Sequence, residues 1–91
     1  MNPDLSRHAR NRMRLYGVTR DDVVACLDRP DAGATEISGE KSYEHAWMDA
    51  VDIQWKRRTG KFLEVVYVVE DGVHVIITLG PRDEAVLGGA L

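Results

Sequence analysis

The sequence predicts a small α+β domain in which two N-terminal helices pack on one face of an antiparallel sheet of three to four strands. Two observations favour this fold class. Apolar residues recur at helical spacing over residues 5–28, and from residue 43 onward they alternate with the period of two that is typical of strands. The length of 91 residues suits one core, so we expect a single domain spanning residues 1–91.

The composition indicates a folded, soluble protein. Hydrophobic residues make up 44% of the chain and charged residues 30%, which is ordinary for a globular domain and argues against disorder. Cys26 is the only cysteine, so no intrachain disulfide can form and a reducing, cytoplasmic location is expected. No signal peptide is visible, and the apolar runs are too short to span a bilayer, so we expect no membrane partner.

The first helix is predicted over residues 5–16. Either Asp4 or Ser6 can serve as its N-cap, because both side chains can accept a hydrogen bond from a free backbone N–H of the first turn. Gly17 follows the last periodic residue and is expected to end the helix in the left-handed conformation.

The second helix has a better-marked beginning. Thr19 is followed three residues later by Asp22, which is a capping box with Asp in place of the usual Glu. Val18 and Val23 flank the cap as a hydrophobic staple. The helix must end before Pro30, because the residue that precedes a proline avoids the helical region.

Residues 31–42 form a polar connection, which is either irregular or contains a short edge strand around residues 35–38. A strand pattern follows, interrupted by Asp49, so a bend is expected near residues 48–50. A turn is predicted at residues 58–61. One face of the pattern carries Tyr43, Trp47, Val51, Ile53 and Trp55.

The last two strands are predicted at residues 61–70 and 73–80, and the loop between them sets their register. A two-residue loop would place His74 on the same face as Tyr67, whereas a three-residue loop ending at Gly72 makes that face wholly apolar. We predict the three-residue loop, with Gly72 at positive φ.

The opposite face of this hairpin is then too apolar for plain solvent-exposed surface. We expect another subunit, a ligand or a partner chain to cover it, most simply in a homodimer across a two-fold axis. This mixed face carries Glu64, Val66, Val68, His74, Ile76 and Thr78.

The first helix contains one anomaly. His8 and Arg12 lie one turn apart inside its apolar arc, where a charged guanidinium is costly unless it is paired or open to a cleft. Either the pair is functional, with His8 as general acid or base and Arg12 binding phosphate, or Arg12 pairs with a carboxylate such as Asp28 or Glu64 and His8 caps a carbonyl. The arc is made of Leu5, Ala9, Met13, Leu15 and Tyr16.

The net charge is −3, but basic residues are concentrated in two groups that could form one RNA-binding patch if the fold joins them. Otherwise they are solvated surface. The histidines and the lone cysteine do not have metal-site spacing, so we expect no metal and no cofactor. The basic residues are Arg7, Arg10, Arg14, Lys56, Arg57, Arg58 and Lys61.

Two segments carry a family resemblance: residues 6–30, SRHARNRMRLYGVTRDDVVACLDRP, and residues 62–82, FLEVVYVVEDGVHVIITLGPR. They contain a His-(x)3-Arg-Met motif, a Gly-hydrophobic-Thr start to the second helix, a Leu-x-x-Pro end and a hydrophobic hairpin that closes on a Thr. With these motifs the chain resembles the DUF4258 family of small prokaryotic proteins, which looks related to the RelE/BrnT-like toxins.

The resemblance implies a RelE/BrnT-like fold and a toxin-like, metal-independent endoribonuclease that acts on RNA and is held by an antitoxin protein. His8, Arg12, Tyr67 and Thr78 fall on the family pattern and are the implied catalytic residues. The chain differs from a typical RelE-like toxin in its acidic net charge and in ending soon after the last strand, and both differences argue against ribosome-dependent cleavage. The alternative is a non-catalytic interaction module, an inactive toxin relative that forms a dimer or a partner complex.

Overall fold

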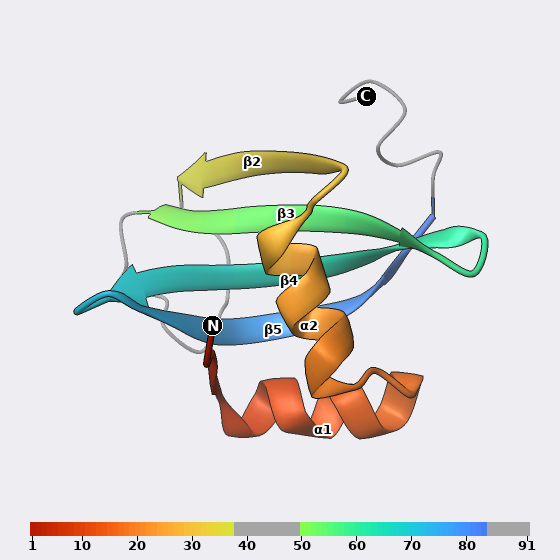
Figure 1. The fold of residues 1–91 in the computed structure, drawn as a ribbon, viewed down its shortest axis with the longest axis horizontal. Coiled ribbons are helices and arrows are strands. Elements are labelled where there is room, and N and C mark those ends of the chain that lie inside the picture. The colour runs from red at the N-terminus through yellow and green to blue at the C-terminus, as the bar shows by residue number, and fades with distance from the viewer. Residues whose placement is uncertain (38–49, 84–91) are drawn as a thin grey trace.

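The computed structural model describes residues 1–37 and 50–83. Within these residues two helices and five strands form an α+β fold, which confirms the predicted class (Figure 1). The elements are β1 (Asp4–Leu5), α1 (Arg7–Tyr16), α2 (Arg20–Asp28), β2 (Ala32–Ile37), β3 (Ala50–Arg58), β4 (Lys61–Glu70) and β5 (Val73–Arg82).

The sheet has the strand order β1-β5-β4-β3-β2. β1 pairs with β5 in parallel and the other neighbours are antiparallel, so the prediction of a purely antiparallel sheet of three to four strands was wrong. Figure 1 shows α2 crossing the sheet and α1 lying along its β5 side. The longer helix has only 10 residues, and neither described helix is long and apolar enough to cross a membrane.

The N-terminal segment explains the difference in strand count. α1 begins at Arg7, not at residue 5, because Leu5 belongs to β1 and pairs with Ile76. Ser6 is the N-cap: its hydroxyl accepts from the N–H of Ala9 at 3.0 Å. The same hydroxyl donates to the carbonyl of Ile77 at 3.0 Å, so the cap also holds the start of α1 against β5.

The boundary between the helices agrees with the sequence. Gly17 ends α1 at φ 64°, and its N–H donates to the carbonyl of Met13. The capping box of α2 is complete: the N–H of Asp22 donates to Thr19 Oγ1 at 3.1 Å, and the N–H of Thr19 donates to Asp22 Oδ2 at 2.9 Å. The hydrogen bond from the Thr19 backbone is the largest cause of the lowered pKa of Asp22.

The segment after α2 contains an edge strand, which was one of the two predictions for residues 31–42. This strand, β2, pairs with β3 and begins at Ala32, three residues before the predicted start. The predicted turn is present, with Thr59 at φ 46° and Gly60 at φ 80°. Tyr43, Trp47 and most of the predicted bend lie outside the described residues. The predicted apolar face of β3 is buried at Val51, Ile53 and Trp55.

The hairpin loop between β4 and β5 differs from the prediction. Glu70 pairs with Val73, so the loop has two residues, Asp71 at φ 50° and Gly72 at φ 76°. Two successive positive φ values are typical of a type I′ turn, which matches the twist of the strands. The positive φ of Gly72 was correct, but the three-residue loop was wrong.

A β-bulge explains why the register was misjudged. Tyr67 pairs with Ile76 and Val66 pairs with Thr78, so Ile77 is an extra residue on β5. Ile76 belongs to the core beneath the helices, whereas Ile77 belongs to the core on the other face. Beyond the bulge, Leu79 therefore lies on the face beneath the helices, as a three-residue loop would have placed it, although it pairs with Val65 and not with Leu63.

Both faces of the sheet carry buried apolar side chains. The face opposite the helices buries Val51, Ile53, Trp55, Phe62, Val66, Val68 and Ile77. The face beneath the helices buries Ala9, Val18, Val23, Cys26, Leu27, Leu63, Val65, Tyr67, Ile76 and Leu79. The expected open mixed face is thus absent at Val66, Val68 and Ile76, which removes the reason given above for a homodimer; the dimer itself stays a prediction.

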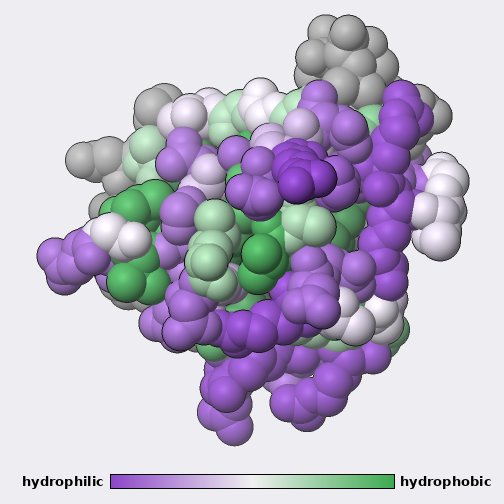
Figure 2. All heavy atoms as spheres, in the orientation of Figure 1, coloured by the Kyte–Doolittle hydropathy of each residue, from purple (hydrophilic) through white to green (hydrophobic). Residues whose placement is uncertain are grey.

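The visible face is mainly hydrophilic over the helices (Figure 2). Hydrophobic residues gather at the end where β4 and β5 join. Val69 is 52% exposed and Val73 is 41% exposed there, so part of the exposed apolar surface lies at the hairpin tip.

Candidate functional site

Side chains spaced four residues apart on α1 face the last part of β5. His8 Nε2 lies 3.0 Å from Thr78 Oγ1, and Arg12 Nε donates to the carbonyl of Leu79 at 2.6 Å. Tyr16 continues the same stripe, because residues at i, i+4 and i+8 lie on one side of a helix. This row of three side chains and the β5 residues beside it are referred to below as the α1–β5 seam.

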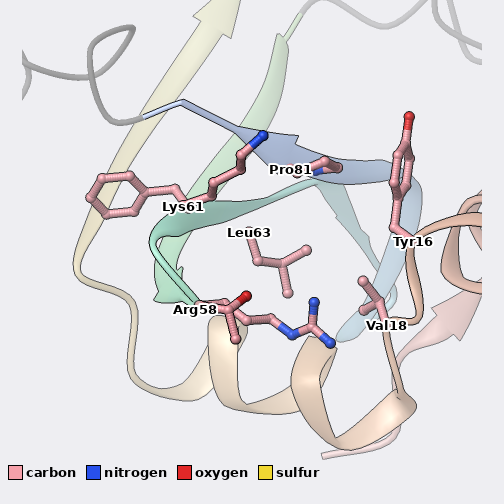
Figure 3. A pocket seen from close by; sticks show the side chains of 8 residues that line it. Tyr16, Val18, Arg58, Lys61, Leu63 and Pro81 are labelled. Atoms are coloured by element: carbon pink, nitrogen blue, oxygen red, sulfur yellow. The ribbon is translucent and has the colours of Figure 1, made fainter.

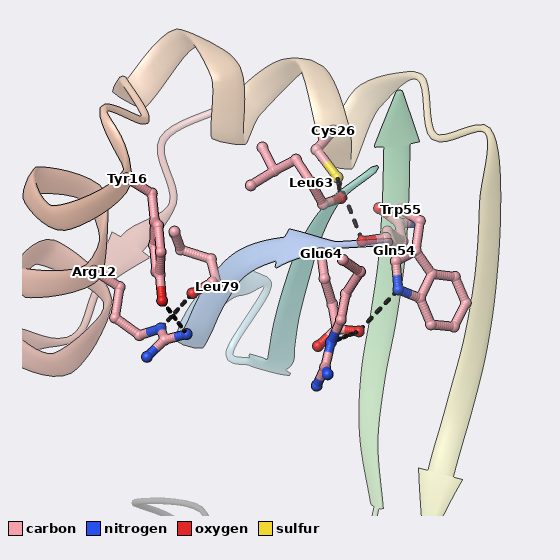
Figure 4. A network of polar contacts seen from close by, with 9 residues as sticks. Arg12, Tyr16, Cys26, Gln54, Trp55, Leu63, Glu64 and Leu79 are labelled. Carbon is pink, nitrogen blue, oxygen red and sulfur yellow. Dashed lines mark hydrogen bonds and ion pairs between the residues drawn. The ribbon is translucent and has the colours of Figure 1, made fainter. Parts of the chain in front are cut away.

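Arg12 makes only neutral contacts within the described part of the chain. Its Nη2 donates to the hydroxyl of Tyr16 at 3.3 Å, and its guanidinium lies over the Tyr16 ring, 5.0 Å from the centroid. Figure 4 shows these contacts together with the bond to Leu79. Arg12 is half-buried, so three neutral contacts with Leu79 and Tyr16 position a cation that is partly withdrawn from water.

The carboxylates proposed as structural partners of Arg12 are engaged elsewhere. Asp28 lies 3.6 Å from Arg29, and Glu64 lies 3.1 Å from Arg82. No described carboxylate lies within 4.0 Å of the Arg12 guanidinium. The suggested ion pair between Arg12 and Asp28 or Glu64 is therefore not formed, and the charge of Arg12 remains available to an anion.

His8 is exposed and has two distinct ring nitrogens. Thr78 Oγ1 contacts Nε2, and Nδ1 has no hydrogen-bond partner among the described residues. In the tautomer whose Nε2–H donates to Thr78, the lone pair lies on Nδ1, where it can accept a proton from a bound group. Thr78 thus positions the ring of His8.

Tyr67, the fourth residue of the family pattern, lies apart from the seam. Its side chain is buried beneath the helices, 5.2 Å from the ring of His74, and it lines a separate pocket with residues of β2 and β3. Burial, followed by the charge of Asp52, raises the pKa of its hydroxyl. The structure therefore brings together His8, Arg12 and Thr78 but not Tyr67.

The predicted basic residues lie on three elements, α1, β3 and β4. Arg7, Arg10 and Arg14 are exposed on α1. Lys56 donates to the carbonyl of Arg29, and the guanidinium of Arg57 lies over the Phe62 ring.

Arg58 and Lys61 alone among the second basic group reach the end of the seam. Arg58 donates to the carbonyl of Gly17, the C-cap of α1, at 2.8 Å. Both cations line a pocket together with Tyr16. Tyr16 was missed as a functional candidate, because it looked like an ordinary member of the apolar arc; its spacing of four from Arg12 was the available signal.

No three His, Cys, Asp or Glu side chains converge as metal ligands anywhere in residues 1–37 and 50–83. Cys26 is buried, and its thiol lies against the carbonyls of Gln54 at 3.4 Å and Leu63 at 3.7 Å. Burial raises the pKa of Cys26 to about 12, so the thiol is protonated and a poor nucleophile at neutral pH.

The fold and the seam define a small two-helix α+β domain with a His-Arg-Tyr stripe set against the last strand. The chain matches the family model described as "Domain of unknown function (DUF4258)" over residues 5–80 and belongs to that family. The match includes His8, Arg12, Tyr16 and Thr78. Comparisons with curated proteins and with solved structures gave no match.

Proposed function

We propose that this domain is a toxin-like ribonuclease that cleaves RNA at the α1–β5 seam without a metal ion. One observation carries the proposal: the half-buried guanidinium of Arg12 has no carboxylate partner among the described residues and lies one helical turn from His8. An unpaired cation beside an exposed imidazole suits a reaction that moves a proton next to a phosphate.

The proposed reaction uses the RNA's own 2′-hydroxyl as nucleophile. His8 Nδ1 takes the proton of the 2′-OH while the 2′-oxygen bonds to the adjacent phosphorus. The P–O5′ bond breaks, a 2′,3′-cyclic phosphate forms, and the departing 5′-oxygen takes a proton from water. Arg12 binds the non-bridging phosphate oxygens, whose negative charge is stabilised in the transition state, and Thr78 keeps the imidazole in position.

Relationship to the RelE/BrnT-like toxins, and an antitoxin as protein partner, are part of this proposal. The exposed Arg7, Arg10 and Arg14 on α1 would guide the RNA backbone to the seam, so binding should weaken steeply as salt is added. The alternative, a non-catalytic module that binds through the mixed sheet face, would need Val66 and Val68 to be accessible, and both are buried in the single chain.

The test is RNA cleavage by the purified full chain in the presence of EDTA, with growth and RNA integrity followed on induced expression. His8→Ala and Arg12→Leu should each lose about 10²-fold or more of the cleavage rate. Arg29→Leu is the matched control: Arg29 is an exposed cation at the C-cap of α2, away from the seam, so this variant should keep full activity.

Melting temperatures of the same proteins separate loss of chemistry from loss of fold. No cleavage by the unmutated protein would replace the enzyme with the interaction module, and full cleavage by Arg12→Leu would overturn the assignment of the reaction to the α1–β5 seam. Arg12→Leu should keep or raise the melting temperature, because an apolar chain suits a half-buried position better than an unpaired charge.

A further inference from the structure

A pocket of about 240 Å³ opens at the C-terminal end of the seam (Figure 3). It lies where the end of α1, the β3–β4 turn and the end of β5 meet. Its volume is below that of most small-molecule sites, so it suits a single ring with its substituents. The lining residues are Tyr16, Val18, Arg58, Thr59, Lys61, Phe62, Leu63 and Pro81.

Part of the pocket lining is apolar and aromatic. Figure 3 shows Leu63 at its centre, with Tyr16 and Val18 on one side and Arg58 on the other. Arg12 lies over the Tyr16 ring and bonds its hydroxyl, so the ring is held in place before any ligand arrives. A fixed aromatic ring beside apolar side chains is a surface on which a planar base can stack.

The charged groups of the pocket are all positive, since none of its lining residues is acidic. Arg58 lies 3.4 Å from Asp22 and is held by Gly17, which fixes its position. Lys61 lies 3.5 Å from Asp83, but both side chains are more than half exposed. Such an exposed pair is weak, so Lys61 can exchange Asp83 for a phosphate oxygen.

We infer that this pocket binds one unpaired nucleotide of single-stranded RNA, with the base against Tyr16 and Leu63 and the phosphate facing Lys61 and Arg58. The identity of the ligand rests on the proposed function. Tyr16 lies eight residues from His8 on the same helix, which is about 12 Å along its axis. The pocket therefore holds a nucleotide close to the cleaved phosphate and selects single strands, because a paired base cannot enter it.

The experiment measures binding separately from cleavage. A fluorescent oligoribonucleotide with 2′-O-methyl groups cannot be cleaved, and it is titrated against the full chain and its variants. Tyr16→Ala should weaken binding by about tenfold, because base stacking on the ring is lost. Tyr16→Phe keeps the ring and should bind within a factor of about two of the unmutated protein.

A set of oligonucleotides, each with one abasic position, locates the stacked base. One abasic position should weaken binding to the unmutated protein, and that penalty should vanish in Tyr16→Ala, as a double-mutant cycle requires when two groups interact. Equal penalties in the two proteins, or unchanged affinity of Tyr16→Ala, would overturn the inference.

Lys61→Gln provides a second variant that should fold whatever happens to Tyr16→Ala, because Lys61 is exposed. It should lower the slope of log affinity against log salt by about one, as expected for one lost phosphate contact. Lys56→Gln is the matched control: Lys56 belongs to the same basic group but does not line the pocket, so the salt slope of this variant should stay closer to that of the unmutated protein.

The two hypotheses fail separately. RNA binding with a Tyr16-dependent abasic penalty but no cleavage would leave the pocket assignment and remove the nuclease. Cleavage that is unaffected by Tyr16→Ala, with no abasic penalty, would leave the nuclease and remove the pocket assignment. Absence of RNA binding at low salt would remove both.

Discussion

The backbone of Gly80 lies directly against the guanidinium of Arg12. A Cβ atom added to Gly80 would lie 2.9 Å from Arg12 Nη2 and 3.6 Å from Nε, and the residue is buried. Its φ lies outside the left-handed region, so the glycine is required by this close approach and not by its backbone conformation. The last strand thus leaves room for the cation of the seam.

Gly80→Ala should displace the Arg12 guanidinium without unfolding the domain. The methyl group meets the end of a flexible side chain, so the cost in stability should stay below about 1 kcal/mol. The shift should weaken the bond to Leu79 and lower RNA cleavage by about tenfold or more, as misplacement of a catalytic group does. Gly33→Ala is the control: its Cβ would make contacts of 3.4 Å or longer, and activity should be retained.

Gly72→Ala should destabilise the domain by about 1 kcal/mol, because alanine is strained at φ 76°. Asp71→Asn at the neighbouring turn position should be neutral or slightly stabilising, since asparagine tolerates the left-handed region. Urea unfolding of both variants measures the difference. If Asp71→Asn lowered the free energy of unfolding as much as Gly72→Ala, the result would contradict the type I′ turn.

The capping box should make stability depend on pH through Asp22. Its pKa in the folded state lies below the ordinary value of 3.8, so the carboxylate stabilises the fold above about pH 3.8, and the contribution is lost as the pH falls through the folded pKa. The difference in melting temperature between the unmutated protein and Asp22→Asn should be largest at neutral pH and shrink in acid. A difference that stays constant from pH 7 to pH 2 would remove Asp22 from this role.

Cys26 should react with thiol reagents only when the protein unfolds. Its side chain is fully buried and its pKa is raised to about 12 by burial, so neither access nor thiolate is available in the folded state at pH 7. The alkylation rate by iodoacetamide should rise with urea in step with the unfolded fraction. Rapid alkylation in the absence of denaturant would contradict the packing of α2 on the sheet.

The parts of the fold that local signals specify were predictable from the sequence. The cap at Thr19, the helix end at Gly17 and the β4 strand appeared where expected, because each depends on a few neighbouring residues. β1 was missed, since a two-residue strand has no period and exists only through its distant partner. The bulge at Ile77 was missed because consecutive apolar residues in β5 do not show in the sequence which of them faces which side of the sheet.

The candidate site was found in part for similar reasons. His8 and Arg12 could be predicted as site residues because they are polar residues within the apolar arc of an amphipathic helix. Tyr16 fits that arc and was therefore not predicted as a site residue, although it contacts Arg12. Tyr67 lies on the family pattern, but a pattern gives position along the chain and not the direction of a side chain, which here points away from the seam.

The bulge at Ile77 also divides the β4–β5 hairpin into two halves with different pairing registers. The two-residue turn sets the register of the tip, whereas Thr78 and the residues after it pair with the first half of β4 in a shifted register. A peptide grafted between Asp71 and Gly72 would therefore lengthen the tip while His8 and Thr78 kept their spacing. The hairpin tip is accordingly the natural attachment point for a fluorophore, an affinity tag or a surface tether on an otherwise unchanged domain.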